Sequence, residues 1–297
     1  SYKVFLPTAG LGSRLGALTK HINKSLISVS NKPAISIQIE KFSKDVEFVI
    51  ALGYQGELVK EYLKLIYKDY KFSFVNVSPY KGLNSGLGLT LLQSQHHLQE
   101  PFIFLSCDTL VEEEIKPPDS NWIGYARVPG SLKQFRTITI NKNDKVNNIY
   151  DKNVIVKKQF PYIGLSGILD YEDFWDSMNN RDPKIIEEGE VYGLKKLISN
   201  KVVNSQLFTW FDTGSKEGLK KANIRYSNSN SPNILIKENE SIWFVKNKVV
   251  KFSSDTEFIR KRVLRTNYIS EFIPKLEIYS KHFYTYNYVE GKIFSEL

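Results

Sequence analysis

Strand-like and helix-like segments alternate regularly through the first 106 residues of the chain. Short apolar runs alternate with stretches in which apolar residues recur at helical spacing. The predicted strands cover residues 4–6, 46–52, 72–77 and 102–106, and the predicted helices begin at Pro33, Gln55 and Leu87. Strands separated by helices of this length predict a parallel sheet with helices on both of its faces.

The pattern changes after Asp119, where strand-like runs follow one another more closely. These runs cover residues 122–128, 136–140, 146–150, 162–169 and 203–209, and helices are predicted at 171–178, 191–200 and 216–226. We therefore predict an α/β domain over residues 1–226, with a Rossmann-like, mixed and mainly parallel sheet.

Residues 227–233 read SNSNSPN, a polar stretch of turn-forming residues that predicts a linker. Residues 234–297 then predict a small β-rich C-terminal piece. It has a hairpin from 241–246 and 249–252, with Asn247 and Lys248 at the turn, and a helix over about 255–267. So short a segment is small for an independent domain, because it buries little apolar surface by itself.

Composition excludes several classes of protein. Cys107 is the one cysteine, which rules out an internal disulfide framework and indicates a reducing, cytoplasmic setting. No apolar run is long enough to span a membrane. The 41 Lys and Arg against 32 Asp and Glu give a net charge of +9, spread along the chain. This charge favours anionic small molecules as ligands over nucleic acid.

A glycine-rich loop follows the first predicted strand. It reads Ala9, Gly10, Leu11, Gly12, Ser13, and its glycines allow backbone N–H groups to approach phosphate oxygens. Arg14 and Lys24 add positive charge where a triphosphate would lie. The spacing is neither a dinucleotide fingerprint nor a P-loop, so the glycines alone are also compatible with a plain strand-to-helix loop.

The wider pattern around this loop is more specific. Gly-x-Gly-x-Arg-Leu, Thr19, Lys24 and Lys32-Pro33 together resemble the signature of nucleotidyltransferases that make NDP-sugars and similar metabolites, the CTP:phosphocholine cytidylyltransferases among them. The resemblance implies that the loop holds an NTP and that Arg14 and Lys24 act catalytically on the charge of its phosphates. Asn23 stands where the family usually has proline, so we expect a less rigid loop.

Two aspartates are the predicted metal ligands. Asp108 follows the apolar run FIFLSC, and carboxylates at the ends of parallel strands lie at the ligand crevice. In the family a glycine precedes this aspartate, and here Cys107 replaces it. Asp212 lies in WFDTGS, which resembles the family's Trp-x-Asp-x-Gly-Thr segment. The resemblance implies that both carboxylates share one Mg²⁺.

The remaining predicted contacts also rest on the resemblance. Asn84, Ser85 and Gly86 match the loop that lies against the nucleobase. Lys152 would bind the acceptor's phosphate, Gly167 would lie under the acceptor, and Glu188, or its neighbour Glu187, would bind acceptor hydroxyls. For Lys152 a solvated surface position is the alternative, and for the two glutamates an exposed helix start.

The C-terminal piece resembles the small lobe of choline kinases and aminoglycoside phosphotransferases. Lys251 would be the ATP-phosphate lysine, Glu257 its partner, and residues 288–291 the hinge. No kinase catalytic loop follows, which suggests one half of a bifunctional protein that makes surface-glycan precursors. The alternative is a β-rich appendage with core aromatic residues. The apolar face of this piece must be covered by the nucleotidyltransferase domain or by another chain, so an oligomer or a missing C-terminal kinase lobe is also possible.

Together these features predict a Mg²⁺-dependent nucleotidyltransferase that joins an NTP to a sugar 1-phosphate or a phospho-alcohol and releases pyrophosphate. The kinase resemblance tilts the prediction toward CTP. A glycosyltransferase that uses an NDP-sugar is one alternative, but Thr109 and Leu110 follow Asp108, so its Asp-x-Asp motif is lacking. A non-catalytic nucleotide-binding regulatory module is the other.

Overall fold

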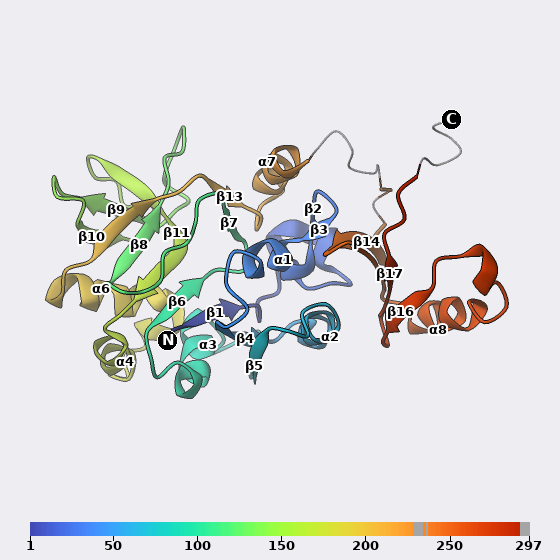
Figure 1. The fold of residues 1–297 in the computed structure, drawn as a ribbon. Coiled ribbons are helices and arrows are strands. Elements are labelled where there is room, and N and C mark those ends of the chain that lie inside the picture. Colours follow the sequence, from blue (N-terminus) through green and yellow to red (C-terminus); the bar gives the residue numbers. More distant parts are fainter. Residues whose placement is uncertain (228–233, 236, 292–297) are drawn as a thin grey trace.

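The computed structural model describes residues 1–227, 234–235 and 237–291, so most of the predicted linker lies outside the described residues. Within those ranges the largest sheet has nine strands, along the path β10-β9-β11-β6-β1-β4-β5. Strand β8 pairs with β11, and β12 pairs with β8. In Figure 1 this sheet runs from β9 and β10 on the left to β4 and β5 near the centre, and the separate C-terminal sheet lies on the right, beyond α1 and α2. None of the described helices is long and apolar enough to cross a membrane.

The first half of the sheet is parallel, as predicted. Strand β1 (Lys3–Pro7) pairs in parallel with β4 (Glu47–Leu52) and with β6 (Phe102–Leu105), and β4 pairs in parallel with β5 (Lys71–Asn76). Because β1 lies between β4 and β6, the chain moves to one side of β1 first and then crosses to the other. The point between β1 and β6 is therefore the topological switch point, where ligands bind in such sheets.

The alternation of side chains along the strands builds one hydrophobic layer on each face. Val4 and Leu6 of β1 join a core that is covered by α1 (Ala34–Ile39) and α2 (Gly56–Ile66), whereas Phe5 joins the opposite core. Helices α3 (Leu87–Ser94), α4 (Tyr171–Met178) and α6 (Glu190–Asn200) cover this second face. The prediction of helices on both faces is confirmed.

The second half of the sheet is mostly antiparallel. Strand β11 (Gln159–Ile168) is long enough to pair with β6, β8 and β9, always antiparallel. The remaining strands are β8 (Trp122–Tyr125), β9 (Thr137–Ile140), β10 (Val146–Tyr150) and β12 (Asn204–Leu207). The smaller elements of this part are η1 (Ser13–Thr19), η2 (Lys24–Leu26), β2 (Ser28–Val29), β3 (Lys32–Pro33), η3 (Gln95–His97) and α5 (Lys184–Glu188).

A two-stranded ribbon connects the segment that follows Asp108 with the segment that ends at Asp212, and the sequence did not predict it. Strand β7 (Thr109–Val111) pairs antiparallel with β13 (Trp210–Asp212), and Asp212 lies opposite Thr109 in the register. The helix α7 (Lys216–Tyr226) begins directly afterwards, where the Ser215 hydroxyl accepts a hydrogen bond from the Gly218 amide. Such a side-chain cap supplies a partner for a helix N–H that otherwise has none.

The C-terminal part forms a four-stranded antiparallel sheet in the order β14-β15-β17-β16. Its elements are β14 (Glu240–Val245), β15 (Lys248–Ser253), α8 (Thr256–Arg265), η4 (Ser270–Phe272), β16 (Leu276–Tyr279) and β17 (Phe283–Asn287). The hairpin prediction is confirmed, but its turn is at Lys246 and Asn247, one residue earlier than predicted. Both turn residues have positive φ, 49° and 61°, which suits the twist of a two-residue hairpin loop.

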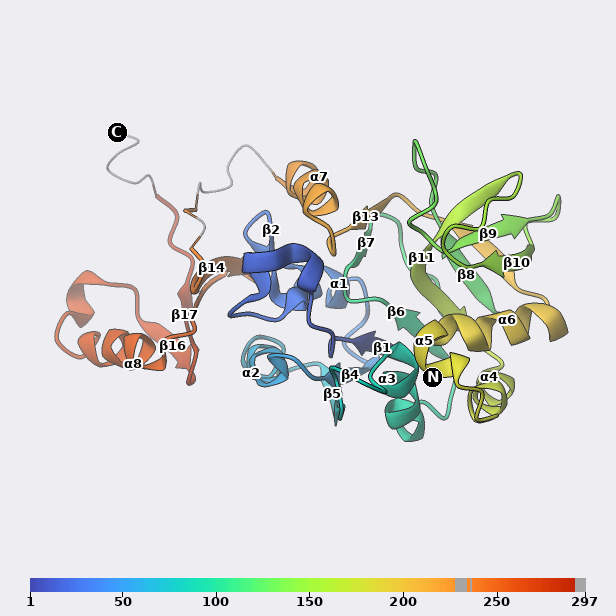
Figure 2. The ribbon, with the colours of Figure 1, turned by 180° about the vertical axis from the view of Figure 1, so that it is seen from behind.

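The C-terminal sheet shares a core with the rest of the chain. Trp243 is fully buried and packs edge-on against Tyr62 of α2, with ring centroids 5.5 Å apart. Phe283 also contacts Tyr62, at 6.0 Å, and the His282 ring nitrogen lies 2.8 Å from a Glu61 carboxylate oxygen. The sequence expectation that this piece needs a covering partner is met by α2 of the same chain (Figure 2).

We expect Trp243→Ala to lower the free energy of unfolding of the whole chain by about 3–5 kcal/mol, as is usual for removing a large buried aromatic ring. Urea unfolding followed by circular dichroism measures this change. Tyr268→Ala is the matched control, because Tyr268 is 87% exposed. An early transition confined to the C-terminal sheet, with the main transition unmoved, would contradict a shared core.

Candidate active site

The loops that carry the predicted site residues lie at one edge of the parallel sheet. The glycine-rich loop follows β1, Gly53 and Tyr54 follow β4, residues 77–86 follow β5, and Asp108 follows β6. Parallel strands end at the same edge, so these loops lie around the switch point between β1 and β6. The Tyr54 amide donates to the Ala9 carbonyl at 3.0 Å, which joins the first two loops directly.

Close packing explains two of the glycines in this region. Gly12 has φ +68°, and a Cβ there would lie 2.9 Å from Thr19 Cγ2 and 3.0 Å from Lys24 Cβ. The Thr19 hydroxyl donates to the Gly12 carbonyl at 3.2 Å. A side chain at Gly53 would lie 2.6 Å from the Ala9 carbonyl oxygen. The loop from Ala9 to Ser13 is therefore folded tightly against its neighbours, with Gly10 and Leu11 on its exposed side.

Asn23 holds this loop in place, which corrects the expectation of a less rigid loop. Its side chain is fully buried, and its amide nitrogen donates to the carbonyls of Thr8, at 2.8 Å, and Tyr54, at 2.6 Å. Its amide oxygen accepts from the Ser25 amide at 2.9 Å and so caps η2, which begins with Lys24. The amide supplies by hydrogen bonds the rigidity that a proline ring supplies covalently.

The predicted catalytic and metal-binding residues converge. Lys24 Nζ lies 3.0 Å from Asp108 Oδ2, although 84 residues separate them in the sequence. Arg14 lies 3.5 Å from Asp108 and 3.8 Å from Asp212, so its guanidinium bridges the two carboxylates. The Ser106 hydroxyl donates to Asp108 Oδ1 at 2.6 Å. The structure thus brings all four charged groups to the switch point.

Burial and charge act in opposite directions on these groups. Burial raises the pKa of Asp108, but the Lys24 ammonium and the Ser106 hydroxyl outweigh it and lower that pKa to about 2. Burial lowers the pKa of Lys24, yet the Asp108 carboxylate raises it overall. For Asp212, burial and the charge of Asp108 together raise the pKa. The two carboxylates therefore repel each other, and this repulsion is relieved by cations.

This pair of carboxylates fits a magnesium ion. Hard oxygen ligands from one or two carboxylates, completed by water and phosphate oxygens, are what Mg²⁺ takes in proteins. A Cβ on Gly214 would lie 2.5 Å from Asp108 Oδ2 and 3.0 Å from Asp212 Oδ1, so both carboxylates face the same small space. Among the described residues no group of three or more His, Cys, Asp or Glu forms an all-protein cage.

Cys107 lies beside Lys24 as a buried, protonated thiol. Its thiol is buried, and burial raises its pKa to about 11 despite the nearby Lys24. A thiol that stays protonated in this way is a poor nucleophile. This agrees with the reading of Cys107 as a small buried substitute for glycine.

The predicted base loop is exposed at its tip and fixed at its base. Asn84 has φ +63°, and the Ser85 hydroxyl donates to the Gly82 carbonyl at 2.7 Å. A side chain at Gly86 would collide with the Ile186 carbonyl of α5. The loop is therefore seated on α5, the helix that carries Glu188.

A second charged cluster surrounds Glu188. Lys195 Nζ lies 2.9 Å from the Glu188 carboxylate and 3.0 Å from the Asp151 carboxylate. Arg136 lies 3.4 Å from Asp151 and donates to the Glu188 carbonyl at 2.9 Å. The sequence reasoning found Glu188 but missed Arg136 and Lys195. Helical periodicity gave no signal for this pair, because Glu188 ends α5, Lys195 lies in α6, and Gly189 between them is non-helical with φ +64°.

The two other predicted acceptor residues, Lys152 and Gly167, lie in different surroundings. Lys152 is exposed beside Asp151, so its predicted phosphate contact stays a prediction. Gly167 is buried, and a side chain there would collide with the indole of Trp122, so its place under the acceptor stays a prediction. Gly164 of the same strand lies beside Ser106, two residues before Asp108. It has φ +69°, a Cβ on it would lie 2.8 Å from Ser106 Cβ, and its carbonyl accepts from the Ser106 amide at 2.8 Å.

The predicted kinase pair is also absent from the described part of the chain. Glu257 pairs with Arg260, at 2.6 Å, and with Lys261. Lys251 has its pKa lowered by burial and by the charge of Arg262. The predicted pairing of Lys251 with Glu257 is therefore wrong, because both cations that neutralise Glu257 lie on its own helix.

Comparison with known proteins places these observations in a class. No family model matches the chain. The chain is 27% identical to the bifunctional protein GlmU of Methanococcus vannielii over 238 residues, which are 76% of this chain and 55% of that protein. It is 30% identical to mannose-1-phosphate guanyltransferase of Schizosaccharomyces pombe over 116 residues, 37% of this chain and 31% of that protein. The chain spans about half the length of the GlmU relatives it matches.

Solved structures show the same fold. UDP-glucose pyrophosphorylase, complexed with UDP-glucose, aligns with a TM-score of 0.65 at 20% identity, over 76% of this chain and 98% of that one. A putative glucose-1-phosphate thymidylyltransferase from Bacillus anthracis aligns with a TM-score of 0.64 at 16% identity, over 80% and 98%. The predicted fold class is confirmed. The sequence relatives named by their reaction are sugar-1-phosphate nucleotidyltransferases, so the predicted relationship to NDP-sugar pyrophosphorylases is supported.

A buried carboxyl group beside the Glu188 cluster gives a pH-dependent prediction. Glu190 is 4% exposed, and within the described residues its Oε2 has no hydrogen-bond partner. Burial raises its pKa from 4.5 to about 7, although the charge of Arg136 opposes the shift. The folded chain therefore keeps a proton that the unfolded chain releases as the pH rises from 4.5 to about 7, so the free energy of unfolding should fall over that range.

Glu190→Gln removes this titration. We expect the stability of the variant relative to wild type to increase between about pH 5 and 8, measured by urea unfolding at a series of pH values. Glu114→Gln, at an exposed position, is the control. Parallel stability profiles for wild type and the Glu190 variant would show that burial of Glu190 does not shift its pKa.

Proposed function

We propose that the chain transfers the nucleotidyl group of an NTP to a sugar 1-phosphate, with Mg²⁺, and releases pyrophosphate. The observation that carries this proposal is the convergence of Lys24 and Arg14 on Asp108 and Asp212, beside a tightly folded glycine-rich loop. Two cations and two carboxylates at a sheet's switch point suit a triphosphate with its metal ion. The relatives support the same reaction class.

In the proposed reaction an oxygen of the acceptor phosphate attacks the α-phosphorus of the NTP. The bond from that phosphorus to the bridging oxygen breaks, and pyrophosphate leaves with the electron pair. No general base is needed because the attacking oxygen is already an anion. Catalysis then consists of positioning and of charge stabilisation, as in other phosphoryl-group transfers.

Each charged residue has a part in that scheme. Backbone N–H groups of the loop 9–13 would face the phosphates, and Lys24 and Arg14 would stabilise the charge that builds up on them. Mg²⁺, held by Asp108 and Asp212, would neutralise the phosphates at the reacting centre. Lys24 and Arg14 also pair with these carboxylates, so they share the neutralisation of their charge.

The Glu188 cluster is the proposed acceptor side. Carboxylates of Glu188 and Asp151 suit sugar hydroxyls, and Lys195 and Arg136 suit an anionic acceptor. The four groups hold one another at 2.9–3.4 Å, so the surface they present is already ordered before the acceptor binds. This favours a sugar 1-phosphate over a phospho-alcohol, which has fewer hydroxyls to bind.

The CTP preference and a linked kinase activity rest on the resemblance of residues 234–297 alone.

The reaction is tested by pyrophosphate release from each common NTP, including CTP, with hexose and heptose 1-phosphates and phosphocholine as acceptors. We expect release that requires one acceptor, and about a 100-fold or greater loss for Asp108→Asn and for Asp212→Asn, since each removes a charge that holds the metal. Asp176→Asn, on the exposed side of α4, is the control. Near-wild-type rates in both variants would refute the metal assignment.

Two other outcomes would favour the alternative functions. Release of nucleoside diphosphate from an NDP-sugar would favour a glycosyltransferase, and nucleotide binding without turnover would favour a regulatory module.

The acceptor side has its own test. We expect Lys195→Met to raise the KM for the sugar 1-phosphate about tenfold, because a charge-assisted hydrogen bond contributes roughly 1.5 kcal/mol or more. Lys152→Met tests the predicted phosphate contact in the same assay, and Lys220→Met, exposed on α7, is the matched control. A rise confined to the KM for the NTP would assign Lys195 to the nucleotide instead.

A further inference from the structure

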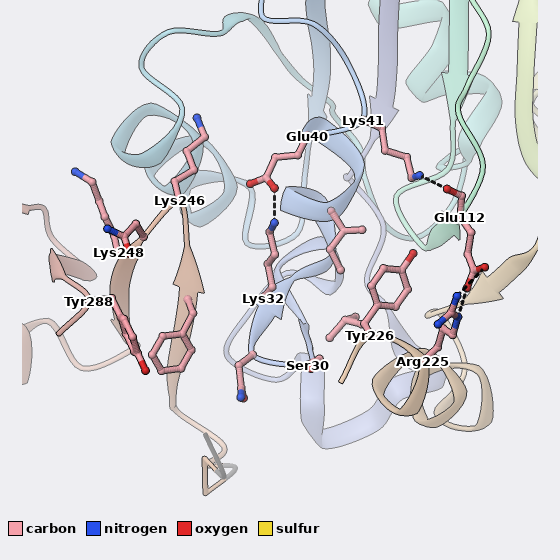
Figure 3. A pocket seen from close by; sticks show the side chains of 15 residues that line it. Ser30, Lys32, Glu40, Lys41, Glu112, Arg225, Tyr226, Lys246, Lys248 and Tyr288 are labelled. Carbon is pink, nitrogen blue, oxygen red and sulfur yellow. Dashed lines mark hydrogen bonds and ion pairs between the residues drawn. The ribbon is translucent and has the colours of Figure 1, made fainter. Parts of the chain in front are cut away.

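A large cavity lies behind the candidate active site, between the main domain and the C-terminal sheet. Its volume is about 840 Å³, within the usual range for small-molecule sites. Figure 3 shows Arg225 and Tyr226 of α7 on one wall and Lys246, Lys248 and Tyr288 of the C-terminal part on the other. Neither the main domain nor the C-terminal part forms this cavity alone.

The walls carry an excess of positive charge. Five cationic side chains line the cavity against two carboxylates, those of Glu40 and Glu112. Both carboxylates are already engaged, Glu40 by Lys32 and by the Tyr67 hydroxyl, at 2.7 Å, and Glu112 by Arg225. The cationic residues are Lys32, Lys41, Arg225, Lys246 and Lys248. Lys248 is paired with Glu277, which lies outside the lining, so among the described residues Lys41 and Lys246 are the two lining cations without a carboxylate in ion-pair contact.

Lys246 has no carboxylate in ion-pair contact among the described residues. Its ammonium lies over the rings of Tyr67 and Tyr70, 4.3 Å and 4.7 Å from their centroids. Burial lowers its pKa, and the charge of Lys44 acts in the same direction. An anion in the cavity would therefore meet a cation that the protein itself leaves unneutralised.

Aromatic rings complete the lining. Phe244 and Tyr288 pack edge to face with centroids 5.6 Å apart and both reach the cavity. Tyr226 faces it from α7, and within the described residues its buried hydroxyl has no hydrogen-bond partner. Flat rings from two sides offer surfaces on which a planar base can stack.

The cavity is distinct from the catalytic centre but tied to it. Lys41 Nζ donates to the carbonyls of Glu112, at 2.9 Å, and Glu113, at 3.1 Å. Gln38, one helical turn before Lys41, donates to the carbonyls of Ser106 and Thr109, both at 2.8 Å. These two carbonyls flank Asp108, so the cavity wall and the metal-binding segment share one hydrogen-bonded framework.

We propose that this cavity is a second, non-catalytic site for a nucleoside phosphate. The phosphates would be held by Lys246, together with Lys248 and Lys32, which pair with Glu277 and Glu40 in this structure. The base would lie against Tyr288 and Tyr226. A small inorganic anion would leave the aromatic walls uncovered, and an uncharged aromatic molecule would leave the positive charge unneutralised. A nucleoside phosphate would place its phosphates against the cationic side chains and its base against the aromatic rings, and a molecule of this size fits the cavity volume.

The test counts bound nucleotides on the full chain. Radiolabelled ATP, CTP, GTP and UTP are each used in equilibrium dialysis without acceptor, against wild type and the double variant Lys246→Met/Lys248→Met. The matched control is Lys237→Met/Lys261→Met, which removes the same charge from the same part of the chain outside this cavity. Far-UV circular dichroism and thermal unfolding confirm that both variants are folded.

For at least one nucleotide we expect two molecules per chain in wild type and in the control, and one in the Lys246/Lys248 variant. One molecule in wild type that is lost in the variant would support the cavity and refute nucleotide binding at the catalytic loop. Equal binding to wild type and the variant, or no binding to either, would overturn the cavity proposal, whatever the result of the pyrophosphate assay.

Discussion

The ion pair between Lys24 and Asp108 is the contact on which the candidate active site depends. It connects the loop after β1 with the loop after β6 across the switch point of the sheet. Two buried charges are costly to desolvate, and removing one partner leaves the other uncompensated. The surrounding hydrogen bonds of Asn23 and Ser106 hold both groups in position. The charges of the site are thus held in fixed positions, as the proposed nucleotidyl transfer requires.

The helix α5 is short, yet it joins the two substrate sides of this site. Its carbonyls contact the base loop through Gly86 and Gly88, where any side chain would collide. Its last carbonyls, those of Glu187 and Glu188, accept hydrogen bonds from Arg136. A shift of the base loop would therefore move Glu188 as well, because the contacts leave no free space between them.

The C-terminal sheet adds both stability and a surface. Its aromatic core joins that of α2, and the Phe244 amide donates to the Asn31 carbonyl at 2.8 Å, beside the large cavity. A short β-rich segment buries little apolar surface alone, so docking onto α2 stabilises it. The same docking places Phe244, Lys246, Lys248 and Tyr288 opposite the cationic wall of the main domain and so completes the cavity.

Local sequence determined the element order and the parallel half of the sheet, whereas the family resemblance pointed to Arg14, Lys24, Asp108 and Asp212 as one cluster. Hydrophobic periodicity and turn residues act over about ten neighbours, and strand ends place their following residues at a known edge. Tertiary structure alone decided that Gly164 packs against Ser106 and Gly167 against Trp122, that Arg136 and Lys195 join Glu188, and that Glu257 pairs with cations of its own helix. These outcomes depend on strand register and on contacts between distant segments, because one residue of shift along β11 exchanges the faces of its side chains.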